Sequence, residues 1–139
     1  MIRVVLDTNI VVSAMLRTGG FPEAALSLAV NRILQLCISE PILAEYQEVL
    51  NRSKLGIDPQ KAATALARIR EAGLLVSPCV PVKACTDPDD NIFLECAEAA
   101  EANFLVTGNT AHFPDVWAKT TIVTPREFLE MILDTQRGK

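Results

Sequence analysis

Val4-Val5-Leu6-Asp7-Thr8-Asn9 places a single carboxylate where an apolar, β-branched stretch ends and a helix is expected to begin. A short continuous apolar run of this kind is typical of a central strand in a parallel sheet, which is covered on both faces. The carboxyl ends of parallel strands form the edge at which open α/β sheets bind their ligands. We therefore expect Asp7 to lie at a binding edge, together with residues from other elements that reach the same edge.

The rest of the chain alternates between short apolar runs and helical patterns. Besides residues 4–6, strands are predicted at 36–38, 74–76, 104–107 and 121–123, and helices at 8–16, 22–33, 40–50, 59–72, 91–100 and 125–133. Ser39 and Asp90 are predicted to be N-caps. This alternation predicts an α/β fold, a three-layer α/β/α arrangement around a central parallel sheet of four to five strands. We expect residues 1–139 to form a single domain.

Length and hydropathy patterning narrow the class of protein. The chain has 139 residues, half of them hydrophobic, which is enough for a compact core. No apolar run approaches the ~18 residues that span a bilayer, and the first residues do not have the pattern of a signal peptide. We therefore expect a cytoplasmic protein with no membrane association.

Cysteine usage and charge limit the chemistry. The four cysteines form no CxxC pair and His112 is the only histidine, which disfavours a zinc cluster; Cys37 and Cys96 are expected in the core. A net charge of -4 disfavours a wide basic surface for nucleic acid. The same charge is compatible with nucleic-acid chemistry if acids cluster around a bound cation.

Acidic residues from distant segments could converge on Asp7. Glu45 lies about two turns into the helix that follows the second strand, and residues 87–90 precede the helix that leads into the fourth strand. Carboxylates that share a small space repel one another unless a cation such as Mg²⁺ or Mn²⁺ is bound. Taken singly, each acid has an ordinary alternative: Asp7 as a helix cap, Glu45 as a solvated residue and 87–90 as turn residues.

Four segments in this order resemble the PIN-domain family, metal-dependent ribonucleases that include the toxins of many bacterial and archaeal toxin–antitoxin pairs. The segments are Val5–Asn9, Ser39–Glu45, Asp87–Leu94 and Phe104–Asn109, the last followed by His112-Phe113. The resemblance covers nearly the whole chain and is strongest to the VapC-like toxin components. It implies a PIN-like fold and hydrolysis of RNA phosphodiester bonds with Mg²⁺ or Mn²⁺ as the cofactor.

The family's catalytic acids and metal ligands match Asp7, Glu45 and Asp90. The family often has a fourth acid just after the last core strand, and this chain has Asn109 there. Asn109 could bind a metal ion through its carbonyl oxygen but adds no negative charge, which leaves the number of metal ions open.

Four further residues enter the site through the same resemblance. Asp115 or Asp89 could compensate for the charge that the fourth acidic position lacks. Asn9 and Thr107 match polar positions that support the site.

The resemblance also implies partners: an RNA substrate, a cognate antitoxin protein and a second copy of the chain in a homodimer. The helices at 10–16 and 24–33 could supply dimer or antitoxin contacts, or their apolar stripes could belong to the core. One Trp and one Tyr leave few surfaces on which bases can stack. Candidate contacts to the RNA backbone are Arg17, Arg52, Lys54 and Lys119.

Two other functions remain open. One is a catalytically weak or inactive PIN-like scaffold that binds RNA or a protein partner, which would fit Asn109 and the acidic net charge. The other is a different α/β enzyme, such as a phosphohydrolase or a receiver domain. A haloacid-type hydrolase requires an acid where Asn9 stands, and a receiver requires a lysine where Gly108-Asn109 stands, so the sequence disfavours both.

Overall fold

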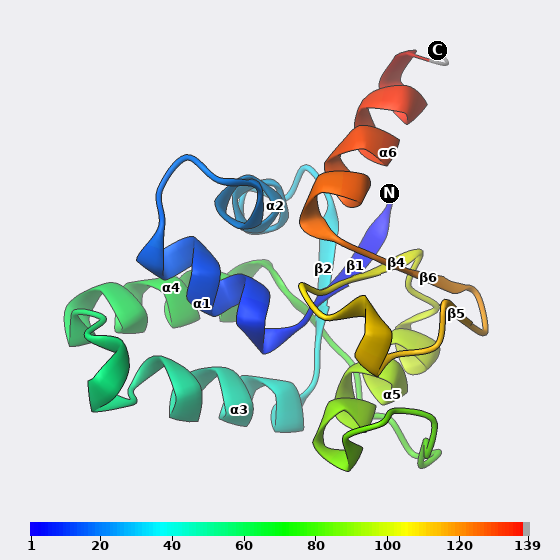
Figure 1. Ribbon diagram of the computed structural model, residues 1–139, viewed down its shortest axis with the longest axis horizontal. Helices are drawn as coiled ribbons and strands as arrows, with labels where there is room; N and C mark the ends of the chain where they lie inside the picture. The colour runs from blue at the N-terminus through cyan, green and yellow to red at the C-terminus, as the bar shows by residue number, and fades with distance from the viewer. Residues whose placement is uncertain (138–139) are drawn as a thin grey trace.

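The computed structural model describes residues 1–137, and a six-stranded sheet lies at its centre (Figure 1). The strands are β1 (Arg3–Leu6), β2 (Gln35–Ile38), β3 (Leu74–Leu75), β4 (Phe104–Val106), β5 (Val116–Trp117) and β6 (Thr120–Val123). Their order across the sheet is β3-β2-β1-β4-β6-β5, and every neighbouring pair is parallel except β5 and β6. The predicted α/β fold with a mostly parallel central sheet is confirmed.

Helices cover both faces of this sheet. They are α1 (Thr8–Leu16), α2 (Phe21–Val30), α3 (Glu40–Leu50), α4 (Pro59–Ala72), α5 (Asn91–Ala100) and α6 (Pro125–Arg137), with short 3₁₀ turns η1 (Ser53–Leu55), η2 (Pro88–Asp90) and η3 (Thr110–His112). Helix α5 packs on β1, β2 and β4 from one side, whereas α2 and α6 pack on the other side (Figure 1). Helix α1 packs on α2 and α3, and α4 packs on α2, α3 and β2. None of the helices within residues 1–137 is long and apolar enough to cross a membrane.

The strands that carry the site are fully buried. Val4, Val5 and Leu6 have no exposed surface, as expected for a central strand covered on both faces. Cys37 and Cys96 are also completely buried, which confirms that they are core residues. Burial raises the pKa of Cys37 to about 11 and that of Cys96 to about 12, so neither thiol ionises readily near neutral pH.

The sheet is larger than predicted because β5 forms an antiparallel hairpin with β6. The connecting turn is Ala118-Lys119, with φ of +53° at Ala118. Two-residue hairpin turns with positive φ are usually marked by Gly, Asn or Asp, and this turn contains none of them. The sequence therefore gives no local signal for the hairpin.

The predicted caps are partly correct. Ser39 caps α3 as expected, because its side chain accepts a hydrogen bond from the Ile42 N–H. Asp90 is the N-cap residue of α5, as predicted, but its side chain makes no capping hydrogen bond. Asp87 caps η2, because its side chain accepts a hydrogen bond from the Asp89 N–H at 3.0 Å. The Asp90 carboxylate is therefore not used by the helix that follows it.

The remaining differences concern the ends of elements. Helix α2 begins one residue earlier than predicted and ends at Val30 instead of Ile33, and α6 extends beyond Leu133 to Arg137. Differences of this size are common at helix ends, where the last turn frays.

Candidate functional site

The carboxyl ends of β1 and β4 meet directly, and Asp7 lies at this junction. Its backbone N–H donates to the Val106 carbonyl at 3.0 Å, which continues the β1–β4 ladder by one residue. The Asp7 side chain is 7% exposed. A carboxylate at the end of a buried central strand is poorly solvated, so it requires specific polar partners.

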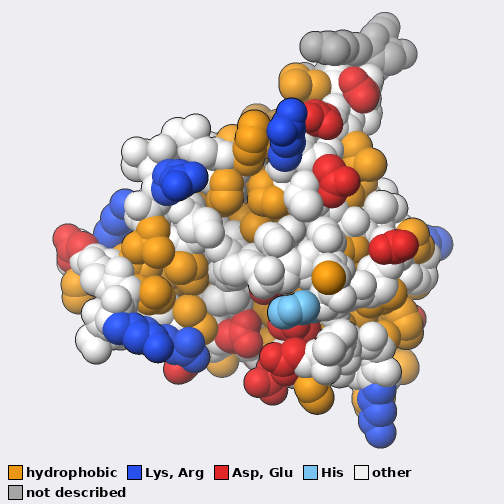
Figure 2. All heavy atoms as spheres, in the orientation of Figure 1, with side chains coloured by type: hydrophobic (Ala, Val, Ile, Leu, Met, Phe, Trp, Pro, Cys, Tyr) orange, Lys and Arg blue, Asp and Glu red, His pale blue; other side chains and the backbone are white. Residues whose placement is uncertain are grey.

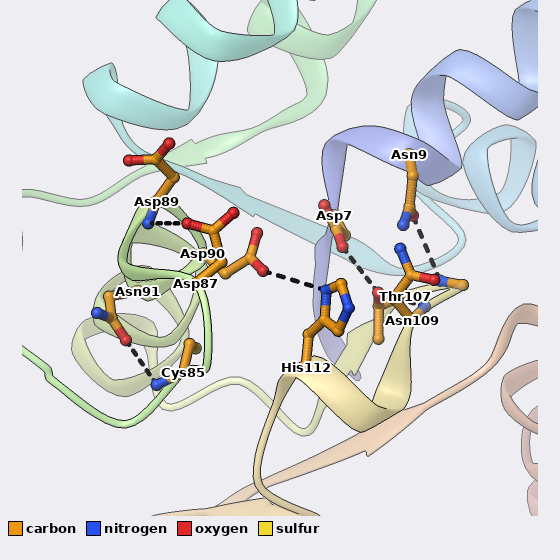
Figure 3. A network of polar contacts seen from close by, with 11 residues as sticks. Asp7, Asn9, Cys85, Asp87, Asp89, Asp90, Asn91, Thr107, Asn109 and His112 are labelled. Carbon is orange, nitrogen blue, oxygen red and sulfur yellow. Dashed lines mark hydrogen bonds and ion pairs between the residues drawn. The ribbon is translucent and has the colours of Figure 1, made fainter.

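Thr107 is the direct partner of the Asp7 carboxylate (Figure 3). The fully buried Thr107 donates from Oγ1 to Asp7 Oδ2 at 2.7 Å and accepts from the Asn109 N–H at 3.0 Å. Burial raises the pKa of Asp7, and the hydrogen bond from Thr107 opposes this rise. Although Asp7 is the N-cap residue of α1, its side chain makes no capping hydrogen bond. Its carboxylate is therefore directed to the site and not to the helix.

Asn9 joins the first turn of α1 to the loop after β4. Its Oδ1 accepts a hydrogen bond from the Gly108 N–H at 3.3 Å. The structure thus brings both predicted supporting residues, Asn9 and Thr107, next to the acidic edge. Their contacts fix the loop that carries Asn109.

Glu45 reaches the same edge from α3. Its Oε2 accepts a hydrogen bond from Thr8 Oγ1, directly beside Asp7 in the sequence. Burial raises the pKa of Glu45, the hydrogen bond from Thr8 lowers it, and the negative charges of Asp7 and Asp89 raise it further. The charges of Glu45 and Asp7 therefore lie close enough to interact.

Tyr46 fixes α3 against the end of β1. This fully buried side chain donates a hydrogen bond from its hydroxyl to the Leu6 carbonyl, immediately before Asp7. From the sequence, Tyr46 is expected only as an apolar core position and Thr8 only as the start of a helix. The one feature of the sequence that could have pointed to them is their position, because Thr8 directly follows Asp7 and Tyr46 directly follows Glu45.

Asp90 lies at the end of η2, opposite Asp7 (Figure 3). Burial and the charges of Asp7 and Asp87 raise the pKa of Asp90 to about 6. His112 Nδ1 lies 3.8 Å from Asp90 Oδ2, and Figure 2 shows acidic side chains beside the single histidine. Asp90 is thus the third acid at this edge, and His112 lies beside it. The sequence resemblance includes His112 but gives it no function at the site.

The donor set suits a hard divalent cation, although the site is not preassembled. Within the described part of the chain, no three His, Cys, Asp or Glu side chains are close enough to hold a metal ion as they stand. The donors at this edge are carboxylate oxygens, which Mg²⁺ and Mn²⁺ prefer, whereas zinc sites are usually built from Cys and His. Because Mg²⁺ usually keeps several waters and needs only one or two carboxylates, direct and water-mediated contacts would suffice.

The other predicted ligands differ in their positions. The backbone of Asn109 is anchored to Thr107, so Asn109 lies at the site (Figure 3). Asp89 is exposed, and its charge contributes to the raised pKa of Glu45. Asp115 is exposed just before β5, and no hydrogen bond or ion pair joins its side chain to the described acids. Asp89 is therefore better placed than Asp115 to supply the charge that Asn109 lacks.

The four basic candidates do not form one surface around the acids. Arg52 and Lys54 follow the end of α3, about 10 Å beyond Glu45 at 1.5 Å per helical residue. Arg17 lies at the far end of α1 from Asp7. Lys119 lies in the β5–β6 turn, at the opposite edge of the sheet, where its Nζ is 3.7 Å from Glu101. Of the four, Arg52 and Lys54 lie on the side of α3 that leads from the acidic edge, and the Arg52 guanidinium also forms an ion pair with Glu48 at 2.9 Å.

Comparisons with known proteins agree with this architecture. A curated relative, uncharacterized protein MJ1680 of Methanocaldococcus jannaschii, is 27% identical over 93% of this chain and 90% of its own length. The fold is similar to VapBC2 from Rickettsia felis, solved bound to a DNA fragment from its promoter (TM-score 0.57, 18% identity, 86% of this chain and 99% of that chain). It is also similar to FitAB bound to a DNA fragment (TM-score 0.58, 17% identity, 88% and 94%) and to the T. brucei RRP44 PIN domain (0.53, 12%, 99% and 84%).

The decisive comparison is with protein families. The model of the PIN domain matches residues 3–111, which include β1, β2, β4 and all three acids at the edge of the sheet. The chain therefore belongs to the PIN domain family.

Proposed function

We propose that this protein is an endoribonuclease that depends on Mg²⁺ or Mn²⁺ and hydrolyses RNA phosphodiester bonds. The observation that carries the proposal is the convergence of Asp7, Glu45 and Asp90 from three distant segments on one sheet edge. Burial raises the pKa of each, and the charge of Asp7 raises the pKa of Glu45 and of Asp90 further. Three such carboxylates without a cation destabilise one another, so their proximity supports a cation-binding role.

Each acid has a distinct role in this proposal. Asp7 and Asp90 would hold the cation, since they face each other across the edge (Figure 3). When bound, a divalent cation activates water and offsets negative charge on the phosphate. Glu45, oriented by Thr8, would position the attacking water and take up its proton. The water oxygen forms the new bond to phosphorus as the opposite P–O bond breaks, and the leaving oxygen takes a proton from solvent water.

Cleavage of a single-stranded RNA by the purified protein tests this proposal. We expect cleavage with Mn²⁺ or Mg²⁺ and none in excess EDTA, and at least a 100-fold lower rate for Asp7→Asn and for Asp90→Asn, because loss of a charged ligand weakens cation binding. Asp134→Asn, at an exposed position on α6, is the matched control and should cleave like the parent. Circular dichroism should show that all three variants are folded. Equal cleavage by the parent and both site variants would contradict the proposed site.

We further propose that the protein is the toxin of a toxin–antitoxin pair. The similarity of its fold to VapBC2 and FitAB supports this role. Leu16 and Phe21 are 54% and 52% exposed and flank a cavity of about 490 Å³ between α1 and α2, which could receive apolar side chains of an antitoxin. Co-expression with the product of a short neighbouring gene, followed by co-purification, tests the partner.

Two outcomes of this co-expression are informative. A stable complex that Leu16→Ser or Phe21→Ser disrupts would support the antitoxin surface, while the same variants alone should still cleave RNA. If the purified protein cleaves RNA, but no complex forms and its expression alone does not stop cell growth, the nuclease proposal stands and the toxin role is contradicted. A scaffold without catalytic activity would instead bind RNA and fail the cleavage assay.

A further inference from the structure

A pocket of about 240 Å³ lies beside the acidic edge, at the carboxyl ends of β2 and β3. Its lining includes Glu40 and Pro41 from α3, Val76 and Pro78 from the segment after β3, and Ile92 and Glu95 from α5. We refer to it as the α3–α5 pocket.

The α3–α5 pocket shares two helices with the proposed catalytic site. On α3, Pro41 precedes Glu45 by four residues, so both lie on one helix face about one turn apart. On α5, Ile92 and Glu95 follow closely after Asp90 and lie three residues apart, again on one face. An RNA strand whose phosphate lies at the acids would therefore have a neighbouring nucleotide within reach of the pocket.

The pocket combines apolar walls with two carboxylates, and Ser39 and Ser77 also line it. Pro41, Val76, Pro78 and Ile92 supply surfaces without polar side chains. Glu95 is half-buried, and its Oε2 accepts a hydrogen bond from the Val82 N–H at 3.0 Å, which orients the carboxylate. Glu40 is exposed, and its side chain makes no hydrogen bond or ion pair within residues 1–137, so its oxygens are available to a ligand.

This lining selects against phosphate and in favour of a planar group that donates hydrogen bonds. Two carboxylates repel an anion, and apolar walls are a poor environment for a strongly hydrated ammonium group. An unstacked base suits both features, because its faces pack against apolar side chains while its Watson–Crick edge is read by hydrogen bonds. The volume is below the ~300 Å³ of pockets for larger ligands, which suits a single base.

We propose that the α3–α5 pocket binds the Watson–Crick edge of an unstacked guanine in the RNA substrate. Guanine has two adjacent N–H donors on this edge, the ring N1–H and the exocyclic amine, and a carboxylate can accept both. Adenine and cytosine offer only the exocyclic amine there. The proposal rests on the proposed nuclease function for its substrate, and it gives that nuclease a preference for RNA with a guanine next to the scissile phosphate.

Binding and cleavage of two matched RNA oligonucleotides test the pocket. They differ only in a single guanosine or inosine, because inosine lacks the exocyclic amine. In the Asp7→Asn variant, which should not cleave, we expect fluorescence anisotropy to show about tenfold tighter binding of the guanosine oligonucleotide. Adding Glu40→Gln and Glu95→Gln together should reduce this ratio to about twofold or less. Glu98→Gln, on α5 outside the pocket, should leave the ratio unchanged.

The cleavage arm uses the same substitutions with Asp7 intact and separates this proposal from the nuclease proposal. A guanosine preference in cleavage that the double variant loses and the Glu98→Gln variant keeps supports the pocket. Efficient cleavage with equal rates for both oligonucleotides overturns the pocket and leaves the nuclease proposal standing. Selective binding of the guanosine oligonucleotide without any cleavage supports the pocket and contradicts the nuclease proposal. If the double variant keeps its RNA selectivity but loses affinity for a protein partner, the pocket is a protein contact and the proposal is overturned.

Discussion

The carboxylate of Asp7 forms a hydrogen bond with a side chain of the site and does not cap the helix that follows it. A residue between a strand and a helix normally caps the helix, yet Asp7 accepts a hydrogen bond from Thr107, one hundred residues away in the sequence. Glu45 is held in a similar way by Thr8. These contacts orient both carboxylates before a ligand binds, which is a common feature of metal-binding and catalytic sites.

Replacing Thr107 with valine should weaken cation binding. Thr107→Val keeps the shape of the side chain but removes a hydrogen bond that lowers the pKa of Asp7, so this pKa rises further. We expect about a 10-fold loss of Mn²⁺ affinity by calorimetric titration. The loss should be larger at pH 6 than at pH 8, because protons compete with the cation for Asp7. Unchanged affinity at both values would show that Asp7 is not a ligand.

Asp90 should make the cation-free protein less stable as the pH rises. Burial and the charges of Asp7 and Asp87 raise its folded-state pKa from 3.8 to about 6, so between these values the folded state binds more protons than the unfolded state. Stability therefore falls as the pH rises from about 4 to about 6, by of the order of 1 kcal/mol for this partly exposed group. Urea unfolding in EDTA should show this fall in the parent. Asp90→Asn should show a smaller fall, and saturating Mn²⁺ should reverse it above pH 6.

Among the elements, those with strong local signals were predicted and those that depend on distant contacts were not. The apolar run of β1, the Pro at the start of α4 and the Ser39 cap each act within a few residues. The hairpin of β5 depends on pairing with β6 through a turn without Gly or Asn. The same hairpin carries Lys119 to the edge opposite the acids. Because the hairpin was not predicted, the sequence could not separate Lys119 from the other candidate RNA contacts, Arg52 and Lys54.

At the candidate site, too, some features could be predicted from the sequence and others depend on tertiary contacts. The three acids could be proposed from the order of strands and helices, because parallel strands bring their carboxyl ends to one edge. The contacts of Thr8 with Glu45 and of Tyr46 with Leu6 could not, since they depend on how α3 packs on β1.

The end of α4 requires a residue without a side chain at Gly73. A Cβ at this position would lie 2.5 Å from Ile38 Cδ1 and 2.9 Å from the Ile69 carbonyl oxygen, both closer than real contacts allow. We expect Gly73→Ala to lower the free energy of unfolding by about 1–3 kcal/mol, because α4 must move away from β2. Gly20→Ala is the matched control: its Cβ would meet nothing closer than 3.5 Å, so urea unfolding should show a clearly smaller change. Equal losses for the two variants would contradict the packing of α4 on β2.

At the scale of the whole molecule, charge limits how the proposed RNA substrate could bind. The chain has 17 acidic and 13 basic residues, and the acids at the sheet edge repel phosphate until a cation offsets them. A long positively charged groove is therefore not the basis for binding. Affinity must come from the cation, from a few basic side chains near α3, and from contacts to the bases.

This distribution predicts a weak dependence of RNA affinity on salt. Each phosphate neutralised by a basic residue contributes a slope of about -0.7 to log affinity against log salt for a single strand. If Arg52 and Lys54 are the basic residues that contact phosphate, the Asp7→Asn variant at fixed Mg²⁺ should show a slope no steeper than about -2. Lys54→Gln should make this slope shallower by about 0.7, because it removes one phosphate contact. Lys119→Gln removes the same charge at the opposite edge, beside Glu101, and should leave the slope unchanged. If the two variants change the slope equally, the RNA does not follow the path from the acidic edge along α3.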